Sequence, residues 1–118
     1  MIVTRGDVVI LDVPYADRPG SKFRPVLIVQ NDHNNARMEN TIVATITTNI
    51  TRGHETTQVL VDSNTPEGKL SGLFALSTVS CENLFTVRRA RITRKVGHLP
   101  DALMQKVDQA LKVSLSLP

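Results

Sequence analysis

The chain has 118 residues, of which 41% are apolar, and it carries a formal net charge of +3. This length suits one domain with a single hydrophobic core and is too short for two ordinary domains, so we expect one domain over residues 1–118. No apolar run approaches the ~18 residues of a membrane-spanning helix, and the start MIVTRGDVVILDV lacks the layout of a signal peptide, so we expect a cytoplasmic protein without a membrane partner.

Strand-like runs occupy the first three quarters of the chain. DVVILDVP at 7–14 is bounded by glycine and proline, and PVLIVQN at 25–31 follows the loop YADRPGSKF. In TIVATITT at 41–48 the side chains fall on two alternating faces, as the period of a strand requires, and the run ends in hydroxyls. TTQVLVD at 56–62 and, after a turn-rich stretch, LFALSTVSCENLFTV at 73–87 continue the β-rich pattern.

The C-terminal segment LPDALMQKVDQALKVSL at 99–115 has a helical period instead. Leu103, Val107, Ala110 and Leu111 stand at i, i+4, i+7 and i+8, the spacing of a helix with one apolar face. Many short strands followed by one amphipathic helix predict a strongly curved sheet or a small barrel with the helix packed on it.

The residue types present exclude several kinds of chemistry. His33, His54, His98 and Cys81 lie far apart with no close pair, so we expect no metal site and no cofactor. There is neither a glycine-rich phosphate loop nor a G-x-S-x-G elbow, which argues against nucleotide hydrolysis and α/β-hydrolase chemistry. The lone thiol of Cys81, inside an apolar run, is typical of a small buried residue.

Basic residues are concentrated in RRARITRK at 88–95, and the sequence pI is near 9.4. A run of this kind is either a solvated face or a contact with nucleic acid, and composition alone does not decide between them. Aromatic side chains that could stack on bases are few.

Three segments resemble the MazF/PemK (Kid-like) family of toxin endoribonucleases in sequence and spacing. They are RGDVVILDVPYADRPGSKFRPVLIVQND from Arg5, TIVATITT from Thr41, and SCENLFTVRRARITRKVGHLPDALMQKVDQAL from Ser80. The resemblance runs from Val3 to Leu115, and the order R-P-V-L-I-V-Q-N-D is its most specific part.

The resemblance implies a mainly β fold with some α: a small SH3-like barrel of the CcdB/PemK type, with about six to seven strands and a C-terminal helix. It implies the toxin of a type II toxin–antitoxin system, a homodimeric mRNA interferase that cuts single-stranded RNA without a metal. A cognate antitoxin would inhibit this activity, and we expect the antitoxin to bind through an acidic, partly disordered segment.

In the family, the arginine of the R-P-V block and the threonine closing the I-T strand form the catalytic pair, which here are Arg24 and Thr47. A guanidinium can donate two parallel hydrogen bonds to phosphate oxygens, and Pro25 restricts the backbone beside it. The ribose 2′-hydroxyl is the nucleophile, so the expected products are 2′,3′-cyclic phosphate and 5′-hydroxyl ends. Glu82 stands where many relatives carry an acidic residue, and is either the general base or the ion-pair partner of a following arginine.

Further RNA contacts are expected in the loop between the first two strands and around the neighbouring residues Glu82 and Asn83. At the position of Phe85 members of the family commonly have an arginine, and Phe85 could stack on a base instead. Thr48 should point to the opposite face from Thr47, so only one of them faces the phosphate. Each loop residue could equally belong to a variable exposed turn. The RNA-binding candidates are Tyr15, Arg18, Lys22, Thr48, Asn83, Phe85 and Arg88.

Two other functions stay open at this point. One is a non-catalytic toxin on the same barrel that binds a protein target such as DNA gyrase, which would not need Arg24 and Thr47 together. The other is a barrel that binds RNA without cutting it, which the change at Phe85 allows. Function belongs to sites and not to folds, so the fold cannot separate these alternatives.

Overall fold

The computed structural model describes all 118 residues as six strands and a small set of helices. The strands are β1 (Asp7–Pro14), β2 (Ser21–Ile28), β3 (Asn40–Thr47), β4 (Gln58–Val61), β5 (Ser77–Arg88) and β6 (Ile92–His98). The helices are α1 (Asp32–Arg37), α2 (Pro66–Lys69), the 3-10 turn η1 (Arg89–Arg91) and α3 (Asp101–Leu115). No helix is both long and apolar enough to span a membrane.

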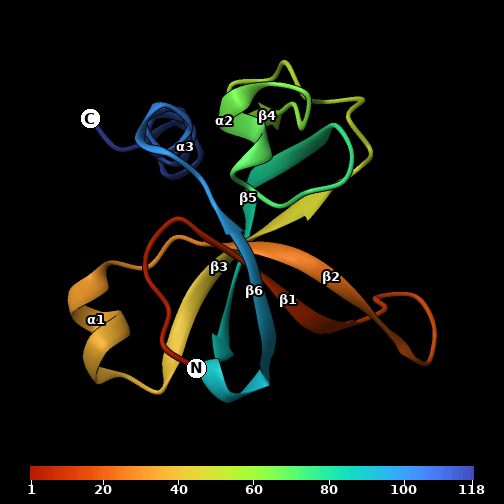
Figure 1. The fold of residues 1–118 in the computed structure, drawn as a ribbon, viewed down its shortest axis with the longest axis vertical. Coiled ribbons are helices and arrows are strands. Elements are labelled where there is room, and N and C mark those ends of the chain that lie inside the picture. The colour runs from red at the N-terminus through yellow and green to blue at the C-terminus, as the bar shows by residue number, and fades with distance from the viewer.

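The six strands form one antiparallel sheet in the order β4-β5-β3-β2-β1-β6. β5, the longest strand with 12 residues, passes from the upper to the lower part of the molecule, and the sheet bends so strongly that it separates into two arms (Figure 1). β4, α2 and the start of β5 lie in the upper arm, close to α3, whereas β1, β2 and β6 lie below. The predicted mainly β fold with six strands and a C-terminal helix is confirmed, but the sheet stays open, with β4 and β6 as its edges.

Two apolar clusters lie on the two faces of the bent sheet. The larger one is covered by α3, which buries Leu103, Met104, Val107 and Ala110 against it and so confirms the predicted apolar stripe. The smaller one joins β1, β2, β3, β5 and β6. Burying one Val or Leu side chain contributes about 1.5–3 kcal/mol, so these clusters are what holds the bent sheet in shape.

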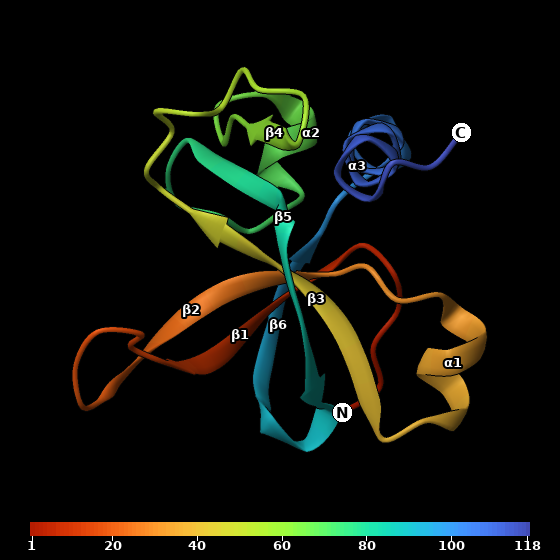
Figure 2. The ribbon, with the colours of Figure 1, turned by 180° about the vertical axis from the view of Figure 1, so that it is seen from behind.

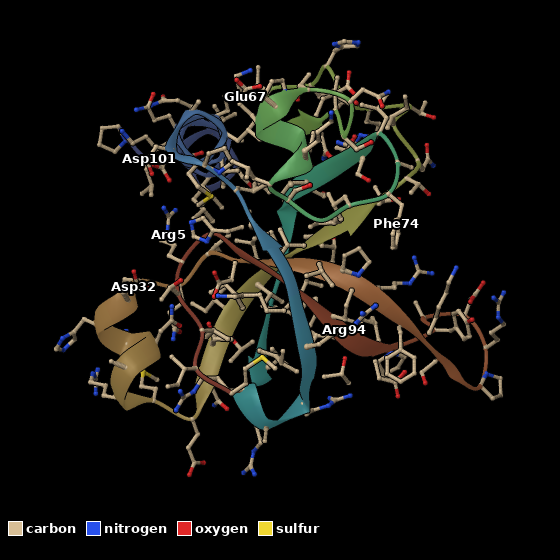
Figure 3. All side chains as sticks on the ribbon, in the orientation of Figure 1. Arg5, Asp32, Glu67, Phe74, Arg94 and Asp101 are labelled. Atoms are coloured by element: carbon tan, nitrogen blue, oxygen red, sulfur yellow. The ribbon has the colours of Figure 1, made fainter.

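The segment before β1 connects several elements through polar contacts. Arg5 is labelled near α3 in Figure 3. It donates from Nε to the Val29 carbonyl (2.8 Å) and pairs through Nη2 with Asp108 of α3 (2.7 Å). Asp7 is fully buried and accepts from the Thr4 N–H (2.8 Å), while its Oδ1 lies 2.8 Å from His98 Nδ1. The N-terminal segment therefore fixes the ends of β2, β6 and α3 relative to one another.

Two elements lie where the sequence pattern indicated none. α1 follows β2, and its first residues are capped by the Asn31 side chain, which accepts from the Asn34 N–H (2.8 Å). β6 forms from the basic run and pairs with β1 at the sheet edge, with Thr93, Arg94 and Lys95 all exposed. Exposed cations are common on edge strands because they discourage pairing with other chains.

Candidate active site

The site begins where β2 and β3 stop pairing. The ladder between them has three residue pairs and ends at Val26↔Thr45, while β2 stays paired with β1 as far as Pro14↔Ser21 and β3 stays paired with β5 as far as Thr47↔Thr78. The β1–β2 hairpin consequently projects away from the end of β3 (Figure 2). Pro25 is the first β2 residue beyond the ladder, where a residue without an N–H removes no hydrogen bond to β3.

A pocket of about 120 Å³ lies in this split, and we call it the split pocket. Continuing the β2–β3 register by two residues places Arg24 opposite Thr47, on one face of the two strands. The structure thus brings together the two residues predicted as the catalytic pair, from separate strands. The pocket is lined by Lys22, Phe23, Arg24, Pro25, Ile46, Thr47, Thr48 and Ser77.

Both members of the pair have hydrogen-bonding capacity to spare. The Asn49 N–H donates to Thr47 Oγ1 (3.0 Å), which leaves the hydroxyl proton of Thr47 free to donate to a ligand. The Arg24 side chain is partly buried and takes part in no hydrogen bond or ion pair within the chain, unlike Arg5 or Arg52. A guanidinium fork beside a free hydroxyl is an arrangement suited to phosphate oxygens.

A second pocket, of about 360 Å³, adjoins the first and shares Thr47 with it; we call it the polar pocket. Its lining contains no apolar residue. Thr45 and Thr47 of β3 stand opposite Ser80 and Thr78 of β5, and Gln58 of β4 stands opposite Ser80, so one face of three strands is polar here. The lining residues are Thr45, Thr47, Asn49, Thr51, Arg52, Gln58, Ser80 and Asn83.

A bulge in β5 shapes the polar pocket. Ala44 pairs with Leu84 but the next β3 residue, Thr45, pairs with Ser80, so residues 81–83 have no partner in β3. Bulges bend a strand and redirect its side chains. In this bulge Cys81 is buried in the larger apolar cluster, whereas Glu82 and Asn83 are exposed on the side of the polar pocket.

Glu82 is held in an ion-pair network and lines neither pocket. It pairs with Arg52 Nη1, and it accepts from Gln58 Nε2 (2.9 Å). Glu55 Oε1 lies 2.7 Å from Arg52 Nη2. The hydrogen bonds that Arg52 donates to Glu55 and then to Glu82 raise the pKa of Arg52, and the bond to Arg52 lowers the pKa of Glu55. An arginine does pair with Glu82, but it comes from the β3–β4 loop and does not follow it in sequence.

The other predicted RNA contacts divide into two groups. Lys22 and Thr48 line the split pocket, and Asn83 lines the polar pocket. The remaining four lie outside both linings.

Those four side chains have other neighbours. The Arg18 guanidinium stacks over the Tyr15 ring, 4.1 Å from its centroid, in the β1–β2 loop. Phe85 packs against the smaller apolar cluster and pairs with Val43. Arg88 lies at the far end of β5, in a separate pocket near the N-terminus.

Sequence reasoning missed several residues of the polar pocket. Gln58 is the first residue of β4 and Ser80 lies within β5, and only the pairing of these two strands places both side chains at the pocket. Asn49, Thr51 and Arg52 come from the β3–β4 loop, whose position depends on long-range packing. Nothing in their local sequence pattern places them beside Thr47.

Comparison with known proteins shows which family the chain belongs to. The model of the family of PemK-like, MazF-like toxins of type II toxin–antitoxin systems matches residues 4–115. Endoribonuclease EndoA of Bacillus subtilis (strain 168) is 39% identical in an alignment that covers 99% of this chain and 97% of the relative.

Solved structures give the same result. An endoribonuclease in complex with its cognate antitoxin from Mycobacterial species is 26% identical, with a TM-score of 0.78 over 98% of this chain and 97% of that one. The Mycobacterium tuberculosis toxin MazF-mt6 is 27% identical, with a TM-score of 0.72 over 93% of this chain and 98% of that one. The chain belongs to the family of PemK-like, MazF-like toxins of type II toxin–antitoxin systems.

Proposed function

We propose that this toxin is an endoribonuclease that cleaves single-stranded RNA without a metal, with Arg24 and Thr47 as its catalytic residues. We base this on one observation: these two side chains line one small pocket and keep their hydrogen-bond donors free. Relatives described as endoribonucleases support the same activity. Messenger RNA is the proposed substrate, and the cytoplasm is where the toxin would meet it.

The reaction is a transfer of the phosphorus between oxygens of the RNA itself. The ribose 2′-oxygen forms a bond to phosphorus and loses its proton, the bond from phosphorus to the 5′-oxygen breaks, and that oxygen gains a proton. The products are a 2′,3′-cyclic phosphate and a 5′-hydroxyl. The enzyme has to align the attacking oxygen and stabilise the negative charge that grows on the non-bridging oxygens.

Arg24 and Thr47 suit the second task. The Arg24 fork can donate two hydrogen bonds to the non-bridging oxygens, and Thr47 can donate a third from the opposite strand. Because Asn49 already donates to Thr47 Oγ1, the hydroxyl proton is directed away from the backbone. Removal of one such donor costs roughly 3–4 kcal/mol in the transition state, which is a factor of ~10²–10³ in rate.

The split pocket offers no side chain of the usual kind for transferring the protons of the 2′-hydroxyl and the 5′-oxygen. No histidine or carboxylate lines the split pocket. Glu82, the third predicted catalytic residue, would have to leave Arg52 and Gln58 before it could accept a proton from the 2′-hydroxyl. We therefore propose that Glu82 acts mainly by fixing Arg52 and Gln58, and that Arg24 and Thr47 provide most of the rate enhancement.

We propose two further properties that relatives support: assembly as a homodimer, and inhibition by a cognate antitoxin. One of the solved relatives is an endoribonuclease bound to its cognate antitoxin. A disordered acidic segment could place carboxylates on the free donors of Arg24 and Lys22. Added salt should then weaken the complex, and an affinity that is indifferent to ionic strength would argue against this mode of inhibition.

The deciding experiment incubates the purified protein with a long single-stranded RNA in EDTA and maps the new ends. We expect discrete cuts with 5′-hydroxyl ends from the wild type, and almost none from Arg24→Ala. Arg37→Ala is the matched control, because Arg37 is exposed on α1 and donates only to Asn34 (3.0 Å). Intact RNA with the wild type, at concentrations where a dimer forms, would instead favour a binding toxin with a protein target.

A further inference from the structure

We infer that Thr78 is a positioning residue for Thr47, whose hydroxyl it orients towards the scissile phosphate when RNA is bound. This rests on the proposed function, because the orientation of the Thr47 hydroxyl matters only if Thr47 donates to a phosphate. Thr78 does not itself contact the substrate, since it is buried and lines neither pocket. It acts through the neighbouring strand.

The hydroxyl of Thr78 is unpaired inside the protein. Thr78 is only 1% exposed, and its Oγ1 is closed off from solvent and has no hydrogen-bond partner. The other buried hydroxyls, those of Thr41, Ser71, Ser77 and Ser80, all take part in hydrogen bonds. Because an unpaired buried hydroxyl destabilises the fold, its presence here indicates a partner that is engaged in another state of the protein.

Thr47 is the neighbour that can be this partner. Thr47 and Thr78 form the last pair of the β3–β5 ladder, and on its other side Thr78 pairs with Leu60 of β4. Paired residues of antiparallel strands point to the same face with their Cβ atoms about 4.5–5.5 Å apart, a spacing at which threonine pairs form hydrogen bonds. Leu60 has no acceptor in its side chain, so the Thr78 hydroxyl can donate across the sheet only to Thr47.

The Thr47 oxygen can accept one more hydrogen bond. It has two lone pairs and one proton, and one lone pair is used by the Asn49 N–H (3.0 Å). With this single donor present, two directions about the C–O bond remain for the hydroxyl proton. A second donor from Thr78 fills the other lone pair, so that one direction remains, in which Thr47 donates to a ligand in the split pocket.

The contact belongs to the RNA-bound state. In the structure without RNA the two hydroxyls are not bonded to each other, and a different staggered rotamer of Thr78 turns its Oγ1 towards Thr47. Hydrogen bonds in a chain polarise one another, so Thr47 becomes a better acceptor once its proton is donated to a phosphate oxygen. An interaction that strengthens as charge grows on the phosphate raises the rate of the chemical step and not the affinity for RNA.

The test measures single-turnover cleavage of a short RNA with one mapped cut site by the wild type, Thr78→Val and Thr78→Ser. Valine has nearly the shape of threonine and lacks the hydroxyl. We expect Thr78→Val to be roughly 3- to 10-fold slower at saturating protein, the effect of one hydrogen bond, with an unchanged half-saturation concentration. Thr78→Ser should restore the rate, because serine keeps the donor.

Thermal unfolding separates positioning from packing. Since the Thr78 hydroxyl is buried and unpaired in the free protein, Thr78→Val should unfold at the wild-type temperature or above it. Thr41→Val is the matched control, because Thr41 is fully buried in β3 but its hydroxyl donates to Asn35 Oδ1 (2.8 Å). The control should unfold at a lower temperature and, while folded, cut RNA at the wild-type rate.

A double-mutant cycle tests whether Thr78 acts through Thr47. In a Thr47→Val background the Thr78 hydroxyl has nothing to orient, so adding Thr78→Val should leave the residual rate unchanged. A further loss as large as in the wild-type background would overturn the positioning role.

The outcomes also separate this inference from the proposed function. Intact RNA with the wild type removes the proposed function and the role of Thr78 with it. Cutting by the wild type and by Thr78→Val at equal rates overturns the role of Thr78 alone. So does a slower Thr78→Val that unfolds at a lower temperature than the wild type, or a loss that Thr78→Ser does not restore.

Discussion

Arg24 and Thr47 line one pocket from two strands whose ladder ends at Val26↔Thr45. The split between the strands is therefore part of the site, because a continued ladder would close the space that a phosphate needs. A planar fork on one side and a short hydroxyl on the other surround that space with donors. The predictions for these two residues depend on donor geometry as well as on charge.

Replacement of Arg24 should separate geometry from charge. We expect Arg24→Ala to lower the cleavage rate by ~10²–10³, and Arg24→Lys to remain at least ~10-fold below the wild type, because an ammonium lacks the planar fork. Single-turnover cleavage of a defined RNA at saturating protein measures both. A lysine variant as fast as the wild type would show that only the positive charge matters.

Replacement of Thr47 should test the hydroxyl. Thr47→Val keeps the shape of the side chain and removes the donor, so we expect a rate loss of about 10²-fold, while Thr47→Ser should stay within about 10-fold of the wild type. Thr86→Val is the matched control on an exposed strand position. Equal rates for the valine and serine variants would mean that Thr47 acts by packing alone.

Glu82→Gln should lower the rate by less than ~10-fold and leave the shape of the pH–rate profile unchanged. The amide can still accept from Gln58, although the ion pair with Arg52 is lost. A general base contributes typically ~10²–10⁴ in rate. A loss of that size, together with disappearance of an acidic limb from the profile, would instead identify Glu82 as the proton acceptor.

Asp7 should make stability depend on pH. Burial by itself would raise the pKa of Asp7, but hydrogen bonds from Thr4 and His98 and the charge of Lys95 outweigh it and lower the pKa below 3.8. The ionised Asp7 therefore stabilises the fold fully at a pH above the pKa that it has in the unfolded chain. This stabilisation is lost as the pH falls through the lower pKa of the folded protein. We expect Asp7→Asn to cost about 1.5–3 kcal/mol in the free energy of unfolding at pH 7.

Urea unfolding at a series of pH values measures this effect. The difference between the wild type and Asp7→Asn should shrink below pH ~4, where the unfolded carboxylate becomes protonated. Asp17→Asn, in the exposed β1–β2 loop, should show no such change. A difference that stays constant down to pH 2 would exclude an ionised Asp7 as the source.

Cys81 should be unreactive in the folded protein. Burial raises the pKa of its thiol to about 11, so little thiolate exists at neutral pH, and the side chain is inaccessible within the larger apolar cluster. Alkylation by iodoacetamide should proceed only after unfolding in urea, as measured by intact mass. Rapid labelling of the native protein would contradict the packing of α3 over β5.

The sequence pattern predicted those strands and helices whose apolar residues recur with the period of the element and are buried in the fold. The run DVVILDVP coincides with β1, and the helical stripe coincides with the buried face of α3. β2 begins earlier than its apolar run, at Ser21, because pairing with β1 extends it through polar residues. β6 was hidden because an edge strand that buries only Ile92 does not produce an alternating pattern.

Some residues at the candidate site were expected from the sequence and others were not. Arg24 and Thr47 were predictable from family resemblance, and Lys22, Thr48 and Asn83 followed from nearness in sequence. Phe85 stays a predicted RNA contact, although in β5 it pairs with Val43 and packs against the smaller apolar cluster. Gln58 and Ser80 became visible only through the register of β4 and β5, which no local pattern contains.

The β5 bulge also bears on how such toxins can diverge. On either side of it, β5 residues pair with β3 and help to fill the apolar clusters, so changes there are constrained by close packing. Glu82 and Asn83 are exposed and unpaired with β3, so their side chains are not constrained by the packing of either apolar cluster. A lineage could therefore change the side chains that border this site at the bulge while inheriting the same folded scaffold.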